Sequence, residues 1–292
     1  MNVPIENSGR EANMDGVKNL TIRVLTDNNA VSGAIWTEHG LSLWIEADDD
    51  VILFDTGAGP ALVNNAPRLG LDLKKVSQAV ISHGHSDHSG GLAGLVETRG
   101  VLPLHLHPDA LIDRFSSRRG SMRSIGMPPA SRGAVHRSSG QVVWCREPVL
   151  VRSGVWVTGP IPRRLAHHVM DPFLFLDEAG IRPDLIVDDQ AMWIDMADGI
   201  VVVTGCAHSG LENTLGYISE LTNKSPVKAI VGGLHLSRAS HEQLSVAAQA
   251  LDAVAPSLII PCHCTGDSGT AFLKERFGTR CVQGLAGAVY SF

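Results

Sequence analysis

Four side chains that can bind a metal ion lie within six residues, in the segment HGHSDH. They are His83, His85, Asp87 and His88. The preceding residues QAVIS are typical of a strand, and side chains alternate along extended backbone, so His83 and His85 can point the same way. We expect those two to bind one ion and the next two to offer an oxygen and a nitrogen to a neighbouring ion. A solvated histidine-rich loop is the weaker alternative.

This donor set predicts chemistry on water. Imidazole and carboxylate together suit Zn²⁺, Fe or Mn²⁺. A bound ion lowers the pKa of its water toward about 7, which supplies hydroxide at neutral pH. Two ions about 3.5 to 4 Å apart would also stabilise the attacking and departing oxygens. We therefore expect one or two ions, zinc first with iron or manganese as alternatives, and Asp87 as both a ligand and a catalytic residue.

The motif H-x-H-x-D-H after a strand, with FDTG before it, resembles the metallo-β-lactamase superfamily from about Thr21 to Phe292. More narrowly, five segments resemble the branch of dihydropterin-methyl-ribofuranosylaminobenzene-phosphate synthases. These are VLTDNN (24–29), GLSLWIE (40–46), TGCAHSG (204–210), VGGLHL (231–236) and PCHCTG (261–266). The chemistry of that branch does not transfer to every member, because function depends on the site and not on the fold.

The resemblance implies that one histidine in the second half and one late histidine complete the two metal shells. His263, at the end of the strand SLIIP, is the candidate for the late position. His208 is the candidate for the other, with Asp188 and Asp189 as competing ligands. In most of the superfamily a bridging aspartate stands where this chain has Cys206, so the bridge stays open and Cys206 is expected beside the ligands.

Four further residues lie at the ends of predicted strands. Asp55 in FDTG can accept the second N–H of a ligand imidazole and fix its tautomer, or it can stabilise the turn. His235, which follows two glycines, is expected to face substrate or to be structural. Cys262 and Cys264 flank His263 and are expected to be small buried apolar side chains. Structural roles are expected for the remaining histidines, which are His39, His105, His107, His136, His167, His168 and His241.

The arginines are concentrated in one interval of an otherwise acidic chain. Between Arg114 and Arg164 there are ten arginines, no lysine and one acid, Glu147, so the net charge of this interval is +9. Because the whole chain carries −6, the rest of the chain carries −6 − 9 = −15. Arginine binds phosphate in a bidentate manner, so a phosphorylated or carboxylated small molecule is favoured over a merely solvated loop. We expect an arginine-rich lid over about 108–165. The resemblance of GPIPRR to the synthase branch implies that Arg163 is the anion contact.

The elements that must position these residues are strands and helices in alternation. Strands are predicted at 21–26, 41–47, 51–55, 78–82, 155–159, 190–196, 200–205 and 257–261, and helices at 60–70, 90–100, 211–222, 241–254 and 270–278. Ser209 before Glu212 and Ser240 before Gln243 have the spacing of capping boxes. Two sheets covered outside by helices fit this order, which gives an α/β four-layer αββα sandwich in 19–292 as a single domain.

Composition fits a globular enzyme, with 44% hydrophobic and 18% charged residues. Residues 1–18 are polar and are expected to be a flexible leader. The absence of a long apolar run or a signal-like start predicts a cytoplasmic protein with no membrane partner. An odd number of cysteines, five, predicts free thiols. Nucleic acid is an unlikely partner because few aromatic residues accompany the arginines, and self-association is open.

The sequence is compatible with three functions. The first is a metal-dependent hydrolase acting on a phosphorylated or otherwise anionic small molecule. The second is the pterin-methyl transfer that the branch name describes, which needs two organic substrates. The third is a metal-binding sensor without turnover.

Overall fold

Two large sheets form the centre of the computed structural model, which describes residues 16–165 and 171–292. The first sheet has the order β16-β1-β2-β3-β4-β5-β8. In that order its strands are Val289–Ser291, Leu20–Thr26, Ser42–Ala47, Asp50–Phe54, Gln78–Val80, Leu104–Leu106 and Val142–Trp144. The second sheet has the order β15-β14-β13-β12-β10-β9. Its strands are Leu258–Cys262, Val227–Gly233, Gly199–Thr204, Ala191–Met196, Val155–Val157 and Val149–Arg152.

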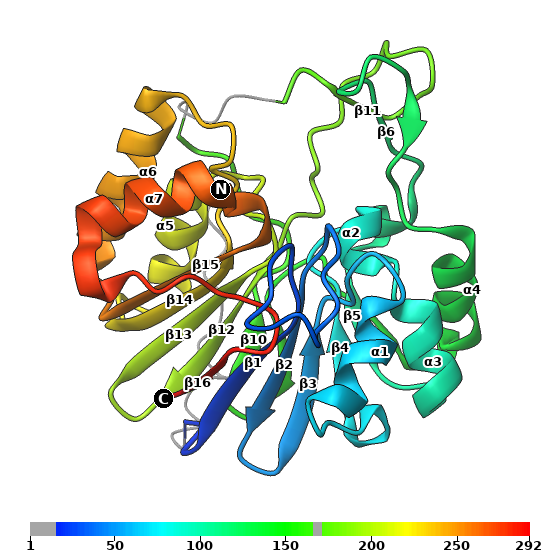
Figure 1. Cartoon of the computed structure of the whole chain (residues 1–292), viewed down its shortest axis with the longest axis horizontal. Helices are drawn as coiled ribbons and strands as arrows, with labels where there is room; N and C mark the ends of the chain where they lie inside the picture. Colours follow the sequence, from blue (N-terminus) through cyan, green and yellow to red (C-terminus); the bar gives the residue numbers. More distant parts are fainter. Residues whose placement is uncertain (1–15, 166–170) are drawn as a thin grey trace.

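Helices cover the outer face of each sheet, which gives the predicted four-layer αββα sandwich (Figure 1). The first sheet carries α1 (Ala61–Arg68), α3 (Leu92–Arg99) and α4 (Pro129–Arg137), and the second carries α5 (Leu211–Leu221), α6 (His241–Val254) and α7 (Gly266–Phe277). The short α2 (Ser86–Ser89) lies at the end of β4. Short 3-10 turns cover Leu73–Lys75, Pro108–Leu111, Ser139–Gln141, His263–Thr265 and Gly278–Arg280.

Apolar side chains from alternate strand positions fill the three spaces between these layers. Between the sheets, residues such as Ile22, Leu43 and Ile52 meet Val201 and Ile260 of the other sheet. A second cluster packs the first sheet against α1, α3 and α4, and a third packs the second sheet against α5, α6 and α7. Central strands buried on both faces hold their ends in fixed positions, which a metal site requires.

Parallel pairing brings the functional strand ends to one edge. Strands β3 and β4 are parallel, and so are β13, β14 and β15. Because the carboxyl ends of parallel strands meet at the same edge of a sheet, the residues that follow these strands can converge. The two sheets face each other, so both sets of ends contribute to one site.

Only part of the interval expected to form a lid, about 108–165, lies outside the two large sheets. Its strands β8, β9 and β10 belong to the two large sheets. The part that stands apart in Figure 1 is the small sheet of β11 (Leu174–Phe175), β6 (Phe115–Ser116) and β7 (Arg123–Ser124). Most of the expected leader falls outside the described residues, but Val17 is buried and its N–H donates to the Asp195 carbonyl at 2.8 Å.

The two predicted helix caps have different outcomes. Ser240 forms a full capping box with Gln243, as predicted. The cap predicted at Ser209 is wrong, because α5 begins behind Gly210 with no side-chain cap. The Ser209 N–H donates instead to Asp189 Oδ2 at 2.7 Å. The last helix also begins four residues before the expected Thr270, at Gly266. Within the described part, no helix is long and apolar enough to cross a membrane.

Candidate metal centre

Asp55 is the buried carboxylate that orients the first histidines. It follows β3 with a φ of 58°, a left-handed conformation that costs on the order of 1 kcal/mol. Its Oδ1 accepts the Ser82 N–H at 2.7 Å, and its Oδ2 lies 2.7 Å from both Ser82 Oγ and His88 Nδ1. Asp55 therefore holds the proton of His88 on Nδ1 and leaves Nε2 free for a metal ion.

Three imidazoles form the first donor group, namely His83, His85 and His208. Each offers a ring nitrogen, and these nitrogens lie within 4.8 Å of one another. His83 Nε2 and His85 Nδ1 are 3.0 Å apart, which confirms that the two side chains point the same way. His208 is contributed by the loop after β13, where Ala207 has a φ of 56°. The structure brings the two halves of the chain together here.

The second donor group surrounds the carboxylate of Asp87. Its Oδ2 lies 3.3 Å from His263 Nε2 and 4.0 Å from His88 Nε2. His263 follows β15 with a φ of 46°, and its Nδ1 lies 2.9 Å from Asn28 Oδ1. Its N–H donates to Asp27 Oδ2 at 2.7 Å. Residues after β1 thus fix the late histidine that the sequence places here.

His39 is a member of this second group that sequence reasoning did not select. Its Nε2 lies 3.3 Å from Asp87 Oδ2, and its ring centroid is 4.9 Å from that of His263. Its side chain is 72% exposed, so it closes the group on the solvent side. No local spacing signals this contact, because the loop between β1 and β2 that carries His39 meets the motif only in the folded chain.

Cys206 lies between the two groups. Its Sγ is 3.1 Å from His88 Nε2, and the side chain is buried. The preceding Gly205 permits the close approach of the sheets, because a Cβ there would lie 2.1 Å from Ser82 Oγ. Cys206 therefore lies beside the candidate ligands of both groups.

The donor set fits a cation. Three ring nitrogens of these two donor groups are buried and lack a hydrogen-bond partner within the described part of the chain, namely His85 Nε2, His208 Nε2 and His263 Nε2. Such atoms are costly unless a ligand occupies them. Burial, followed by nearby positive groups, lowers the pKa of His85 to about 3 and that of His208 well below its usual range. Both imidazoles are therefore neutral, which is the form that binds metal.

The second group favours positive charge. Burial alone lowers the pKa of His88, but the carboxylates of Asp55 and Asp87 outweigh it and raise that pKa to about 9. Burial raises the pKa of Asp87, but His88 and His263 outweigh it and hold that pKa well below its usual range. A metal ion at this point would supply the positive charge in place of the proton on His88.

The competing ligands Asp188 and Asp189 contact the backbone around the centre. Asp188 Oδ2 accepts the Gly84 N–H at 2.7 Å, and its Oδ1 lies 2.5 Å from the buried Arg114. Arg114 Nη1 is also 3.2 Å from Asp184 Oδ2. Asp189 accepts the Ser209 N–H, and burial raises the pKa of Asp189 to about 6. These carboxylates position the loops that carry His85 and His208.

His235 and Cys264 form one wall of the centre. Cys264 Sγ accepts the His235 N–H at 3.3 Å and donates to the Cys206 carbonyl at 3.7 Å. The His235 ring centroid is 4.4 Å from that of His208, and the residue is exposed. Cys262 packs in the core between the sheets, as expected. Cys264 is buried too, but among polar groups and not among apolar ones.

Most arginines of the rich interval have partners within the protein. In the described part, five of the ten pair with carboxylates, namely Arg114, Arg118, Arg132, Arg152 and Arg164. Arg163 donates to the Ile186 carbonyl at 3.2 Å and has Asp189, Asp188 and Asp184 around it. The charge available to an external anion is therefore smaller than the sequence indicates.

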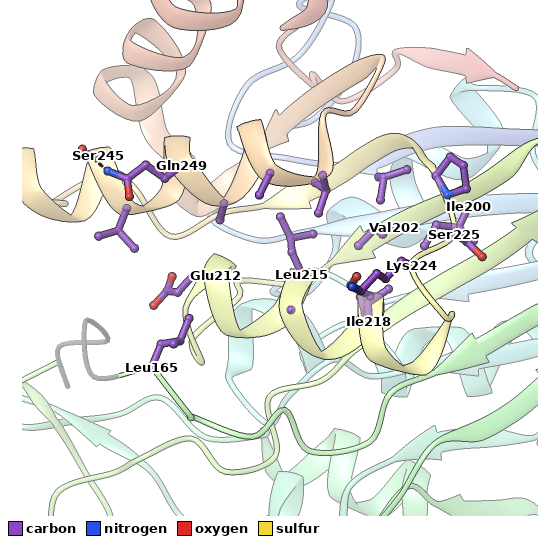
Figure 2. A pocket seen from close by; sticks show the side chains of 18 of the residues that line it. Leu165, Ile200, Val202, Glu212, Leu215, Ile218, Lys224, Ser225, Ser245 and Gln249 are labelled. Atoms are coloured by element: carbon purple, nitrogen blue, oxygen red, sulfur yellow. Dashed lines mark hydrogen bonds between the residues drawn. The ribbon is translucent and has the colours of Figure 1, made fainter. Parts of the chain in front are cut away.

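A large apolar hollow lies apart from the donors. A cavity of about 1030 Å³ is lined by residues of α5 and α6, and Leu215, Ile218 and Val202 are among its lining side chains (Figure 2). A hollow of about 70 Å³ beside it includes His235 and Ala207. Both share Glu212 and Val246 as lining residues. We therefore place the candidate reaction site at the donor groups and not in the larger cavity.

The chain belongs to the metallo-β-lactamase superfamily, whose sequence profile matches residues 36–263. A curated relative from Methanocaldococcus jannaschii, 7,8-dihydropterin-6-methyl-4-(beta-D-ribofuranosyl)-aminobenzene-5'-phosphate synthase, is 26% identical, and the match covers 96% of this chain and 99% of that protein. The crystal structure of Tm1679, described as a metal-dependent hydrolase of the beta-lactamase superfamily, has a TM-score of 0.80 and 29% identity, with 93% of this chain and 98% of that chain covered.

A more distant solved structure supports the fold alone. The structure of a diphosphatase of the PhnP family has a TM-score of 0.52 at 14% identity, with 94% of this chain and 98% of that chain covered. The superfamily and the synthase-like branch expected from the sequence motifs are both supported by these matches.

Proposed function

We propose that this protein is a metal-dependent hydrolase acting on a phosphorylated or otherwise anionic small molecule. The observation that carries the proposal is the joint placement of two donor groups, His83–His85–His208 and Asp87–His88–His263, on either side of one buried sulfur. Zinc bound there would supply hydroxide at neutral pH by lowering the pKa of a coordinated water toward about 7. Zinc is preferred to iron and manganese because imidazole, carboxylate and thiol donors all suit it.

The protein side chains have distinct roles in this proposal. Asp55 holds His88 in the tautomer that presents Nε2. Asp87 would help to hold the second ion. Its Oδ2 lies 3.3 Å from His39 Nε2, so it would orient His39 to take up the proton that a coordinated water releases and to pass it on to solvent. The exposed position of His39 supports that route.

An arginine cluster beside His235 is proposed to bind the anionic group. Burial lowers the pKa of Arg118, and the charges of Arg238 and Arg123 lower it further. Arg118 itself is paired with Asp171. The positive charge of Arg118 also acts to lower the pKa of His235. Guanidinium groups at the edge of a metal site would favour phosphate. Because Arg163 has three acidic neighbours and Arg118 is paired with Asp171, we propose Arg238 and Arg123 as the anion contacts in place of Arg163.

Metal content and turnover test the proposal. Purified wild-type protein is expected to hold one or two equivalents of zinc by elemental analysis, and His83→Ala is expected to lose at least one. His136→Ala, an exposed histidine on α4, is the matched control and should keep them all. Turnover of phosphoester and pyrophosphate substrates should fall in parallel with metal. Unchanged metal in His83→Ala would overturn the metal assignment, and zinc-loaded protein inactive on the whole series would overturn the hydrolase.

A second candidate is the synthase reaction named for the relative from M. jannaschii, because the match covers nearly the whole length of both chains. Hydrolysis consumes water and one organic substrate, whereas transfer joins two organic substrates. Incorporation of ¹⁸O from labelled water into the product supports hydrolysis. A joined product that forms only when a pterin and an aminobenzene substrate are both present supports transfer. A metal-binding sensor would bind zinc and turn over neither.

A further inference from the structure

We propose that the Cys206 thiolate is itself a metal ligand, shared between the two ion positions. This inference rests on the proposed function, because it requires metal at both donor groups. It adds a sulfur donor to a centre otherwise made of imidazole and carboxylate. It also gives a spectroscopic signature that imidazole and carboxylate ligands do not have.

The placement of Cys206 carries the proposal. Its Sγ lies within 4.8 Å of the ring nitrogens of His83 and His88, and in a second set within 4.8 Å of those of His208 and His235. A third set joins the same sulfur to His263 and Cys264. One atom therefore reaches donors of both groups, and it lies 3.1 Å from His88 Nε2.

The surroundings of Cys206 differ from those of a cysteine that only fills space. Cys145 and Cys262 lie in the apolar core between the sheets, and each donates its S–H to a backbone carbonyl two residues earlier, at 3.6 Å and 3.5 Å. Cys206 has imidazole nitrogens around its sulfur. On metal binding the S–H bond breaks, the sulfur keeps the electron pair for the ion, and the proton is released to solvent.

Cys264 provides a matched control within the same cluster. Its sulfur is engaged by backbone groups, since it accepts the His235 N–H and donates to the Cys206 carbonyl. These contacts make Cys264 a positioning residue for the loops on either side. The same Cys→Ser change at the two sites therefore separates ligation from local packing.

Cobalt substitution tests the inference. Protein loaded with Co²⁺ in place of zinc is expected to show a thiolate-to-cobalt charge-transfer band in the near ultraviolet, in addition to the visible bands of bound cobalt. Cys206→Ser should lose the charge-transfer band and Cys264→Ser should keep it. Cys206→Asp supplies an oxygen ligand that can stand in for the sulfur, so it should bind cobalt without the band if the serine variant fails to fold.

The outcomes separate this inference from the proposed function. A wild-type protein that binds cobalt but shows no charge-transfer band, or a band that persists in Cys206→Ser or Cys206→Asp, overturns the sulfur ligand alone. A band lost in Cys264→Ser and kept in Cys206→Ser also overturns it. Failure of the wild type to bind any cobalt or zinc would instead overturn the metal-dependent hydrolase.

Discussion

The side chains of Asp55 and His88 are fully buried, and Asp55 Oδ2 accepts the Nδ1–H of His88 at 2.7 Å. This contact fixes which nitrogen of His88 faces the centre. It links the end of β3 to the HGHSDH motif, 33 residues later in the chain. A carboxylate behind an imidazole also raises the basicity of the ligand nitrogen.

Replacement of Asp55 by asparagine is therefore expected to weaken zinc binding. The amide keeps the size of the side chain but removes the negative charge behind His88. Loss of such a partner typically costs about 10- to 100-fold in metal affinity. Competition with a chromophoric chelator measures the change, and Asp198→Asn, at an exposed pair with Lys228, is the control. Equal affinities for the two variants would show that Asp55 only stabilises its turn.

His39→Ala is expected to weaken the second equivalent of metal and to leave the first unchanged. His39 contacts Asp87 and His263 but none of the three histidines of the first group. Its exposure predicts little effect on stability. Stepwise zinc titration should show a fall of about tenfold in the second constant. His241→Ala is a control outside the centre, and a loss confined to the first equivalent would contradict the assignment of His39.

Arg238→Ala is expected to raise the KM for a phosphorylated substrate with a smaller effect on kcat. A hydrogen bond to a charged group contributes about 1.5 to 3 kcal/mol, which corresponds to about 10- to 100-fold in KM. Inorganic phosphate should also inhibit the variant less. Arg276→Ala, which removes an exposed arginine paired with Asp252, is the matched control. Equal KM values for the two variants would place the anion elsewhere.

Arg114→Leu is expected to destabilise the protein severely. It removes the cation that forms ion pairs with both buried carboxylates, Asp184 and Asp188. Removal of one partner of a buried ion pair costs about 3 to 5 kcal/mol. Denaturant unfolding measures the loss. The triple variant R114L/D184N/D188N, which removes the unpaired charges, should recover much of it, and no recovery would assign the loss to packing.

His105 predicts a pH dependence of stability away from the centre. Burial lowers its pKa to about 4 in the folded chain, and its Nε2 lies 2.7 Å from Gln78 Oε1. The unfolded chain, with an ordinary pKa of about 6.5, binds more protons between these values. The stability from His105 is therefore complete above pH 6.5 and is lost as pH falls toward 4.

The His105→Gln variant isolates this contribution, because glutamine can still bond to Gln78 but does not titrate. The pH slopes of the free energy of unfolding for wild type and variant should differ by at most about 1.4 kcal/mol per pH unit in this window. Above pH 7 the two slopes should coincide. Parallel profiles throughout pH 4 to 6.5 would contradict the lowered pKa.

The sequence by itself determined the features that depend on neighbouring residues. His83, His85, Asp87 and His88 could be recognised because alternation along a strand and its following turn brings adjacent side chains together. The same local periodicity predicted eight of the strands and five of the helices in the described structure, which was enough to indicate the four-layer fold. The motifs at strand ends were sufficient to identify the superfamily, because the loops that carry the metal ligands follow these strand ends.

Only the tertiary structure decided the contacts between distant segments. The Cys206–His88 contact spans 118 residues, and the contact between the His263 N–H and Asp27 spans 236. Strand order and the stacking of the two sheets bring these groups together, and no local spacing encodes either. The same folding placed His39 beside Asp87. It also paired half of the clustered arginines with acids far away in the sequence, because a charge count along the chain does not show which charges will meet.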